Sequence, residues 1–339
     1  MKKSISFIWV LTLLSGPVSA SAFTAVKDTL PSIPGEHNYI YVRTPLEENE
    51  EKNYDEITFY DGLGRELDFA QSYGANRTAI FIADHHLIEY DSLGRKEKQW
   101  ITAPTSFSYM APEDLKNGIL WDYHDAGKRS YLQTNYESSP LNRITEQYGV
   151  GDAWGNHPAR MEYLTNIPAD SLRCSLYLID DNDALIRRGD YRSGELQVTK
   201  ATDEDGRPTY TFVDKQGRTL LTRIGRGNQQ ADTYFVFDRF GRIRYVLPPM
   251  INDEISAGNL DLYAYQYLYD SFGRCISKKL PSCAAIRYVY DKADRVILSQ
   301  NGNQSQKKEW TFTFYDNQGR LSLTGLCSFN DPPSLDNSI

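Results

Sequence analysis

The stretch Tyr269-Asp270-Ser271-Phe272-Gly273-Arg274 sets the pattern of this chain. An aspartate at the entrance of a turn accepts hydrogen bonds from backbone amides a residue or two onward, and the glycine adopts the positive φ that closes a short loop. Before the turn, aromatic residues alternate with the period of a β-strand, as in Tyr265, Tyr267 and Tyr269. The stretch therefore predicts a strand, a tight turn and a second strand.

The same phrase recurs along the sequence, and we assign it as the structural turn of a repeat. The other clean copies are Tyr60-Asp61-Gly62-Leu63-Gly64-Arg65, Tyr90-Asp91-Ser92-Leu93-Gly94-Arg95, Phe237-Asp238-Arg239-Phe240-Gly241-Arg242 and Tyr315-Asp316-Asn317-Gln318-Gly319-Arg320. Variants are Phe212-Val213-Asp214 leading to Gly217-Arg218, Tyr290-Asp291 leading to Asp294-Arg295, Asp203-Glu204-Asp205-Gly206-Arg207, and a degenerate copy from Tyr136 to Arg143. Internal repetition at this scale predicts a repeat architecture.

The repeat interval fits one hairpin per unit. From Arg218 to Arg320, successive arginines of the phrase are 24, 32, 21 and 25 residues apart. An isolated hairpin is marginal in water, so successive hairpins are expected to stack edge to edge and bury a shared aromatic face. The 24 tyrosines and 14 phenylalanines also favour sheet over helix. The predicted fold class is all-β, with hairpins stacked into a wound or spiral sheet and minor helical insertions.

Upstream, the spacing is looser, which indicates insertions between repeats. Pro112-Glu113-Asp114-Leu115 is expected to open a short helix, and so is the segment after Pro248-Pro249, where Asn252-Asp253-Glu254-Ile255 ends near Gly258. The first strand is expected from Tyr39 to Arg43. The predicted organisation is a signal peptide at 1–22, a flexible leader at 23–37, an N-terminal β domain with degenerate repeats at 38–200, a repeat array at 201–327 and a polar tail at 328–339.

The N-terminus has the pattern of a secretory signal: Lys2 and Lys3, an apolar run from Ile5 to Leu14, and the cleavage pattern Ala20-Ser21-Ala22. The run is shorter than the roughly 20 residues that span a bilayer, so cleavage is favoured over anchoring. We expect export to the periplasm, cell surface or medium. Removing residues 1–22 takes away two lysines and no acid, so the net charge goes from −8 to −10. This charge argues against nucleic acid and anionic membranes as partners.

The recurring phrase resembles the signature of the YD-repeat, or RHS-repeat, family. The segments from Asn38 to Pro45 (NYIYVRTP), from Thr58 to Arg65 and from Leu262 to Tyr267 (LYAYQY) look further like the N-terminal domain of unknown function that begins many RHS-repeat proteins of Bacteroidota. Together the resemblances cover most of residues 38–327. The family implies a β-sheet spiral that closes into a hollow shell around a variable C-terminal segment, often a toxin used in contact-dependent competition.

The chain departs from that family pattern after the last repeat. It stops at Ile339, shortly after Asp331, with no long repeat core, no terminal autoproteolytic segment and no length for a toxin. The resemblance therefore predicts the fold and a delivery context without a toxin activity. A truncated or split relative is an open alternative.

Local motifs of catalysis are absent from the sequence, which has no G-x-S-x-G, H-E-x-x-H or P-loop in a suitable context. His85 and His86 are adjacent on an expected strand, so they point to opposite faces and do not easily share a metal ion. The acidic runs Asp180 to Asp183 and Asp203 to Gly206 lack the closing glutamate of a Ca²⁺ loop and are interpreted as solvated turns. We expect no catalytic residue, no cofactor and no metal site, although the paired carboxylates of a hydrolase leave no local signature.

The four cysteines also lack the spacing of a metal site. They are Cys174, Cys275, Cys283 and Cys327. Disulfides are open in an oxidising compartment, but a chain of this length can bury a sufficient core without them. Buried free thiols are the preferred interpretation.

Two classes of function fit these observations. The first is an exported structural protein, a shell or surface scaffold segment that binds a protein partner or further YD-repeat segments through open sheet edges. The alternative is an extracellular glycan-binding module. In that case exposed rings of the series Tyr263, Tyr265, Tyr267 and Tyr269, expected on one sheet face, would stack on carbohydrate, although packing into the core is favoured for them.

Overall fold

The structure is a computed structural model, and it describes residues 38–46, 52–75, 82–106, 110–122, 128–225 and 230–328. The predicted signal at 1–22, the leader at 23–37 and nearly all of the tail at 328–339 lie outside these residues. Contacts divide the chain into two units, 1–160 and 161–339. The expected change from degenerate to regular repeats near residue 200 stays a prediction.

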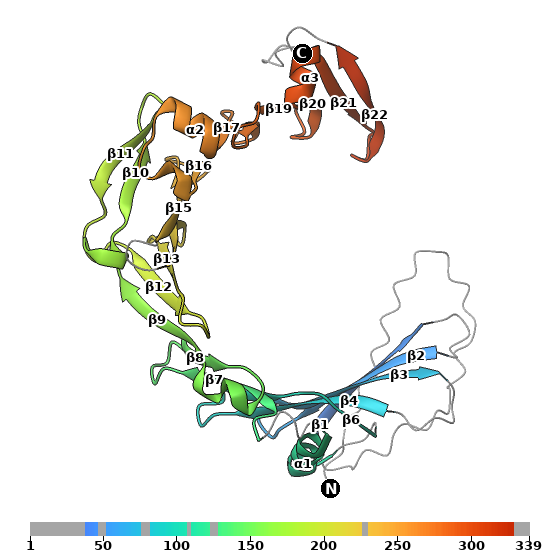
Figure 1. Cartoon of the computed structure of the whole chain (residues 1–339). Helices are drawn as coiled ribbons and strands as arrows, with labels where there is room; N and C mark the ends of the chain where they lie inside the picture. The colour runs from blue at the N-terminus through green and yellow to red at the C-terminus, as the bar shows by residue number, and fades with distance from the viewer. Residues whose placement is uncertain are drawn as a thin grey trace. The chain divides into compact units, whose positions relative to one another are not determined.

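The first unit is an antiparallel sheet with one α-helix (Figure 1). Strands β1 to β4 pair in chain order, β4 pairs with both β5 and β6, and β5 leads through β7 and β8 to β9. The strands are β1 (Asn38–Pro45), β2 (Lys52–Tyr60), β3 (Glu66–Ala75), β4 (Ile82–Tyr90), β5 (Lys96–Trp100), β6 (Ala103–Ser106), β7 (Tyr131–Tyr136), β8 (Ile144–Tyr148) and the start of β9 (Ala159–Thr165).

Helix α1 (Pro112–Asp122) begins at the residue where the sequence predicts a helix. Proline suits the first position of a helix because its missing amide hydrogen would have no partner there. Leu115 and Ile119 are one turn apart, so they share a face, and both are buried against Leu87 and Trp100. The insertion therefore covers one part of the sheet. A short 3-10 helix, η2 (Asp152–Asn156), precedes β9.

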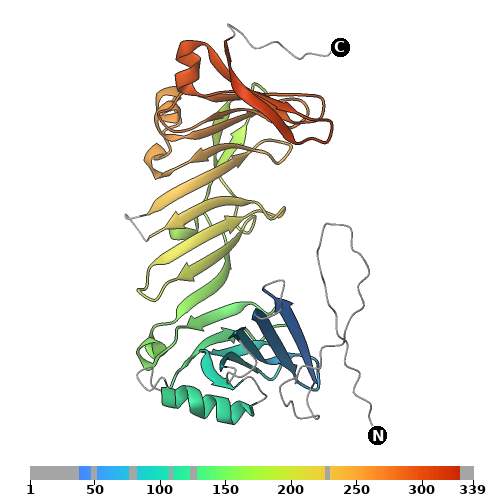
Figure 2. The same ribbon diagram turned by 90° about the vertical axis from the view of Figure 1, so that its right-hand side faces the viewer.

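The second unit is an antiparallel sheet of successive hairpins, with a separate hairpin, β10–β11, beside it (Figures 1 and 2). From β12 to β22 each strand pairs with the next strand of the chain, and β9 pairs with β12. The strands are β10 (Ser175–Ile179), β11 (Leu185–Asp190), β12 (Gln197–Thr202), β13 (Pro208–Val213), β14 (Thr219–Ile224), β15 (Ala231–Phe237), β16 (Ile243–Leu247), β17 (Tyr265–Tyr269), β18 (Cys275–Lys279), β19 (Ile286–Tyr290), β20 (Val296–Gln300), β21 (Glu309–Tyr315) and β22 (Leu321–Ser328). Its helices are η3 (Asp170–Leu172), η5 (Pro249–Ile251), α2 (Ala257–Tyr263) and α3 (Gly302–Lys307).

The core of the second unit lies between the β10–β11 hairpin and one face of the sheet. Phe212 pairs with Leu221 across β13 and β14, and Leu221 pairs with Tyr234 across β14 and β15. Residues that are paired across strands point to the same face, and all three are buried. Tyr177 of the hairpin packs edge-on against Tyr234, with ring centroids 4.9 Å apart. Strand alternation on β13 to β15 thus builds a half-buried sheet that the hairpin covers.

The predicted fold class is confirmed. Both units are antiparallel sheets built from strand–turn–strand hairpins, and helices occur only as short insertions among the described residues. Within the second unit, the sheet curves from β12 to β22 (Figure 1). Strand β1 also contains the first predicted strand, from Tyr39 to Arg43.

The helix predicted after Pro248-Pro249 is displaced. The chain makes only the 3-10 turn η5 there, because Asn252 and Asp253 follow with positive φ of 43° and 64°. The α-helix starts later, where the side chain of Ser256 accepts a hydrogen bond from the amide of Asn259 and caps α2. Since α2 ends at Tyr263, this ring does not belong to a four-residue strand face, and that expectation was wrong.

Candidate functional site

The repeated turns have one common set of hydrogen bonds, illustrated by the turn at Asp238. Its Oδ1 accepts hydrogen bonds from the amides of Phe240 and Arg242, both at 2.9 Å, and its Oδ2 accepts one from Nε of Arg242 at 2.7 Å. Gly241, with φ of +79°, donates its amide to the Asp238 carbonyl at 3.0 Å. The same carboxylate bonds occur at Asp61/Arg65, Asp91/Arg95, Asp214/Arg218, Asp270/Arg274, Asp291/Arg295 and Asp316/Arg320.

The degenerate copies keep the turn and change its side chains. At the Asp291 turn, Asp294 takes the place of glycine with φ of +60°, a conformation that aspartate tolerates better than most residues. Asp180 holds the amides of Asn182 and Ala184 in the same way, but no arginine follows it. The copy before Arg143 uses Glu137, which accepts hydrogen bonds from Nε and Nη2 of Arg143, both at 2.7 Å. A carboxylate that accepts backbone or arginine hydrogens therefore defines every copy described.

These hydrogen bonds favour the ionised carboxylate. Burial raises the pKa of Asp238, but the amide and guanidinium of Arg242 and the amide of Phe240 outweigh that cost, so its pKa lies below the usual range. The guanidinium of Arg143 and the hydroxyl of Ser139 lower the pKa of Glu137 to about 2. Asp238 and Glu137 are therefore charged at neutral pH.

Six of the turn arginines also reach the aromatic residue that opens the next turn. The guanidinium carbon of Arg242 lies 4.8 Å from the ring centroid of Tyr269, within the range of a cation–π contact. The equivalent pairs are Arg65 with Tyr90, Arg95 with Tyr136, Arg218 with Phe237, Arg274 with Tyr290 and Arg295 with Tyr315, at 4.5 to 5.1 Å. The arginine thus closes its own turn and stacks on its neighbour.

The tyrosine hydroxyl returns a hydrogen bond to the preceding repeat. Tyr269 donates to the carbonyl of Ile243, the residue after Arg242, at 2.9 Å. Four other tyrosines do the same at the residue after their stacked arginine: Tyr90 to Glu66, Tyr136 to Lys96, Tyr290 to Cys275 and Tyr315 to Val296, at 2.7 to 3.1 Å. We call this two-way contact, in which an arginine stacks on the next aromatic ring and the hydroxyl bonds back, the turn staple. Phe237 makes only the stacking half because it has no hydroxyl.

The last described turn keeps its internal bonds and lacks a following staple. Arg320 Nε lies 2.7 Å from Asp316 Oδ2, as in the other turns. Its side chain is 73% exposed, whereas the six arginines that stack on a ring are 14 to 36% exposed. Within the described residues, no aromatic ring stacks on Arg320, and β22 pairs only with β21. The guanidinium is therefore held in place and open to solvent.

Apolar side chains are exposed beside this turn. Leu321, Leu323 and Leu326 on β22 are 63, 55 and 65% exposed, and Phe314 on β21 is 59% exposed. Phe314 and Leu323 are paired across the two strands, so they share one face. Leu326 is paired with Thr311 and lies on the other face. Large apolar residues exposed on both faces of a terminal strand are typical of an interaction surface.

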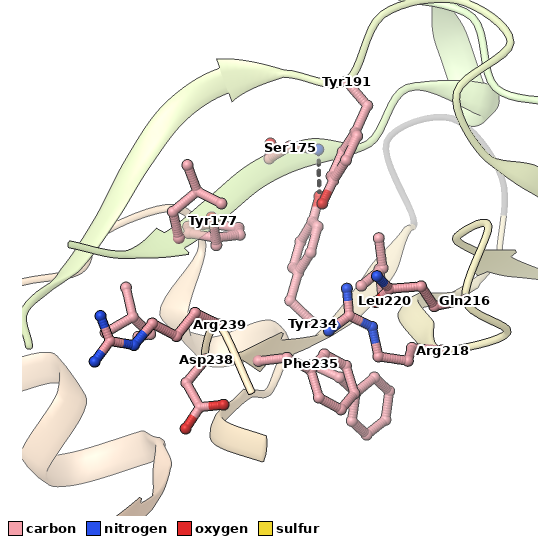
Figure 3. A pocket seen from close by; sticks show the side chains of 13 residues that line it. Ser175, Tyr177, Tyr191, Gln216, Arg218, Leu220, Tyr234, Phe235, Asp238 and Arg239 are labelled. Atoms are coloured by element: carbon pink, nitrogen blue, oxygen red, sulfur yellow. Dashed lines mark hydrogen bonds between the residues drawn. The ribbon is translucent and has the colours of Figure 1, made fainter. Parts of the chain in front are cut away.

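A pocket of about 300 Å³ lies between the β10–β11 hairpin and the sheet (Figure 3). Tyr177, Tyr191 and Tyr234 converge on it, and the hydroxyl of Tyr234 accepts a hydrogen bond from the amide of Ser175 at 3.4 Å. Burial raises the pKa of Tyr191 and of Tyr234 to about 12, and that of the nearby Cys174 thiol to about 12. Groups with raised pKa values stay protonated at neutral pH, so these three groups are not activated as nucleophiles.

A buried ion pair stands beside that pocket. The side chain of Arg223 is 4% exposed; its Nε and Nη2 donate to Asp232 at 2.7 and 2.5 Å, and its Nη1 donates to the carbonyls of Ser171 and Arg173 at 2.9 Å. These four hydrogen bonds occupy most of the guanidinium's donors. We therefore interpret Arg223 as a structural anchor that ties the segment before β10 to the sheet.

The two histidines differ in environment. His85 is fully buried, and its Nδ1 lies 2.6 Å from Asp68 Oδ2. His86 instead contacts the ring of Phe69, with centroids 5.8 Å apart. Within the described residues, no group of three or more His, Cys, Asp or Glu side chains is arranged to hold a metal ion.

Several sequence candidates are placed apart from one another. The run Asp180 to Asp183 is the β10–β11 turn, and Asp183 forms a two-pronged ion pair with the buried Arg244. Asp203 holds the amides of Asp205 and Arg207 in an exposed turn. Sequence patterns do not reveal the Asp183–Arg244 pair, because the partners are 61 residues apart.

The cysteines are all free thiols. Cys174 is buried, Cys275 and Cys327 are partly buried, and Cys283 is exposed. The preferred interpretation of buried thiols therefore describes Cys174 well and Cys283 poorly.

Part of the chain matches a family model of unknown function. Residues 37–165 match the family described as a domain of unknown function, DUF6443. No curated protein matches the chain significantly. None of the helices in the described part of the chain is long and apolar enough to cross a membrane.

Solved structures of toxin complexes have a similar fold. The crystal structure of TcdB2-TccC3 without its hypervariable C-terminal region has a TM-score of 0.55 at 14% identity, covering 87% of this chain and 13% of that chain. The TcdB2-TccC3-Cdc42 structure gives 0.54 at 14%, covering 83 and 13%. A Tc holotoxin pore from Photorhabdus luminescens, carrying the TccC3 mutation D651A, gives 0.53 at 13%, covering 87 and 13%. The chain thus has a fold similar to part of these toxin-complex structures and spans about an eighth of their length.

Proposed function

We propose that this chain is an exported, non-catalytic scaffold segment that assembles with other β-sheet polypeptide, in a context related to RHS toxin delivery. The observation that carries the proposal is the turn staple, in which the repeated Asp, Arg and Tyr residues join one hairpin to the next. A fold made from such joints is a framework that grows by adding hairpins. The shell-like fold of the toxin complexes supports the same role.

The exposed terminal strand supports assembly through a sheet edge. Backbone donors and acceptors of an edge strand pair readily with another strand, and natural proteins often protect them with charge. Strand β22, in contrast, presents leucines on both faces. We therefore place the assembly surface on β22 and the adjoining face of β21.

Light scattering across a range of concentrations, combined with cross-linking of the full chain, tests this proposal. We expect concentration-dependent assembly, or a cross-linked partner, mapped to β22. The double variant Leu323→Lys, Leu326→Lys should abolish it, because both side chains are exposed at that strand. The matched control is Leu63→Lys, the same type of substitution at a turn residue that is 80% exposed. A strictly monomeric chain with no cross-linked partner would contradict the proposal.

A further inference from the structure

The turn staple specifies what can follow a given repeat. Three contacts join Arg274 to the next turn: its guanidinium stacks on Tyr290 at 5.1 Å, its Nη1 donates to the Asp291 carbonyl at 3.0 Å, and Tyr290 donates its hydroxyl to the carbonyl of Cys275 at 2.8 Å. Arg242 makes the same three contacts with Tyr269, Asp270 and Ile243. In both cases the incoming strand ends in a tyrosine followed by an acidic turn residue, whose carbonyl accepts the arginine hydrogen bond.

Arg95 shows that this rule tolerates a degenerate turn. It stacks on Tyr136 at 4.6 Å and donates Nη1 to the carbonyl of Glu137 at 2.9 Å, while Tyr136 bonds to the Lys96 carbonyl at 3.0 Å. The acid has changed from Asp to Glu and the loop is longer, yet all three contacts persist. The arginine thus contacts the aromatic ring and the backbone carbonyl of the residue that follows it.

Arg320 and Leu321 occupy the corresponding positions on the last described turn. Asp316 fixes Nε of Arg320 at 2.7 Å, so the guanidinium has the orientation that stacks on a ring in the earlier turns. The carbonyl of Leu321 has the place that the carbonyls of Cys275 and Ile243 have in theirs. A preorganised cation beside an open strand edge costs little conformational entropy when it binds.

We propose that β22 binds a β-hairpin from outside residues 1–339 whose first strand lies antiparallel to it and ends in a tyrosine followed by an acidic residue. The tyrosine ring stacks on Arg320, its hydroxyl donates to the Leu321 carbonyl, and Nη1 of Arg320 donates to the carbonyl of the acidic residue. This inference rests on the proposed function and adds the chemistry of the partner. Leu323 and Leu326 are also exposed on β22, on opposite faces of the strand.

A cyclised peptide with the sequence of residues 286–300 is a suitable probe. This hairpin contains Tyr290 and Asp291, and in the chain it follows an arginine turn in the way proposed for β22. Cyclisation is needed because an isolated hairpin is marginal in water. Its affinity for the full chain is measured by calorimetry, with protection of the β22 amides from hydrogen exchange as a second readout.

We expect saturable binding with protection of β22, and a loss of about tenfold in affinity for Arg320→Ala, corresponding to one cation–π contact and its hydrogen bond. Arg207→Ala is the matched control and should bind as the unaltered chain does, because Arg207 is 76% exposed in another turn. Replacing the peptide tyrosine by alanine should weaken binding as much as Arg320→Ala does. Arg320→Lys, which retains the charge, should also weaken binding if stacking matters.

Other outcomes overturn the inference in distinguishable ways. Equal affinity for the unaltered chain and for Arg320→Ala, with β22 still protected, rejects the tyrosine-specific contact and leaves the scaffold proposal standing. Assembly of the chain with itself through β22, with no peptide binding, makes a second copy the partner and rejects the hairpin. A monomeric chain that neither binds the peptide nor cross-links through β22 rejects the inference and the scaffold role together.

Discussion

The turns at Asp238 and Asp316 have the same internal geometry and different surroundings. In both, arginine Nε lies 2.7 Å from the aspartate, and two backbone amides donate to the same oxygen. Yet Arg242 is 25% exposed beneath Tyr269, whereas Arg320 is 73% exposed. The comparison separates two roles of the phrase: five residues are enough to form the turn, but a neighbouring repeat is needed to complete the staple.

The largest expected contrast concerns the aromatic faces of interior and terminal repeats. Phe212 is fully buried under the β10–β11 hairpin, while Phe314 is 59% exposed. Phe212→Ala should lower the free energy of unfolding by about 3–5 kcal/mol, because it removes a large buried ring and leaves a cavity. Phe314→Ala should cost less than about 1 kcal/mol. Urea unfolding followed by circular dichroism measures both, and equal losses would mean that the terminal face is covered in solution.

The second largest contrast is expected in the loss of stability when the turn acid is removed. Asp238→Ala leaves two amides and the Arg242 guanidinium without their acceptor in a largely buried setting, and should cost about 2 kcal/mol. Asp316→Ala should cost less, because water replaces the lost acceptor at an exposed turn. Hydrogen exchange of the turn amides tests this locally. A larger effect at Asp316 than at Asp238 would show that the staple adds nothing to the interior turn.

The pH dependence should follow from the depressed carboxyl pKa values. The pKa of Asp238 is lowered in the folded state, so its stabilising effect is complete above the unfolded pKa of about 3.9 and is lost as pH falls through the folded value. The melting temperature should therefore be nearly constant between pH 7 and 5 and should fall below about pH 4. The difference in melting temperature between the unaltered chain and Asp238→Asn should become smaller over that acidic range. A difference that stays constant down to pH 2 would contradict this account.

The smallest expected effect is that of the returning hydroxyl. Tyr269→Phe removes the bond to the Ile243 carbonyl and should cost about 0.5–1.5 kcal/mol. Tyr265→Phe is the matched control on the same strand, since its hydroxyl has no hydrogen bond within the described residues and it should change stability by less than about 0.5 kcal/mol. Phe237→Tyr should add the missing half of a staple and slightly raise the melting temperature. A lower melting temperature for Phe237→Tyr would show that the new hydroxyl does not reach a carbonyl.

The sequence predicted the parts of the fold that depend on near neighbours. The hydrogen bonds of Asp238 to Phe240 and Arg242 span at most four residues, so the phrase itself determines them. Strand alternation likewise puts Phe212 on one face with Tyr210, two residues earlier, and both are buried. Helix α1 was predictable because Pro112 and two acidic residues open it.

Contacts that depend on tertiary register were not predictable in the same way. The stacking of Arg242 on Tyr269 requires that β16 and β17 pair at a particular register across the insertion that holds α2. The pair Asp183–Arg244 requires the β10–β11 hairpin to leave the sheet and lie beside it. The series from Tyr263 to Tyr269 misled because its alternation continues into the end of α2, where Ser256 caps a helix that the pattern does not reveal.

The staple has a consequence for how such a chain changes length. Each stacked arginine contacts its own turn and the turn that follows it, so stability accumulates through links between adjacent hairpins, as in a one-dimensional chain of coupled units. Gaining or losing a whole hairpin by recombination keeps every remaining link intact, whereas losing a single strand places a tyrosine opposite the wrong carbonyl. The array is therefore open to evolution in steps of one hairpin, and among the described hairpins the last one has the fewest such links, because Arg320 has no ring to stack on within the described residues.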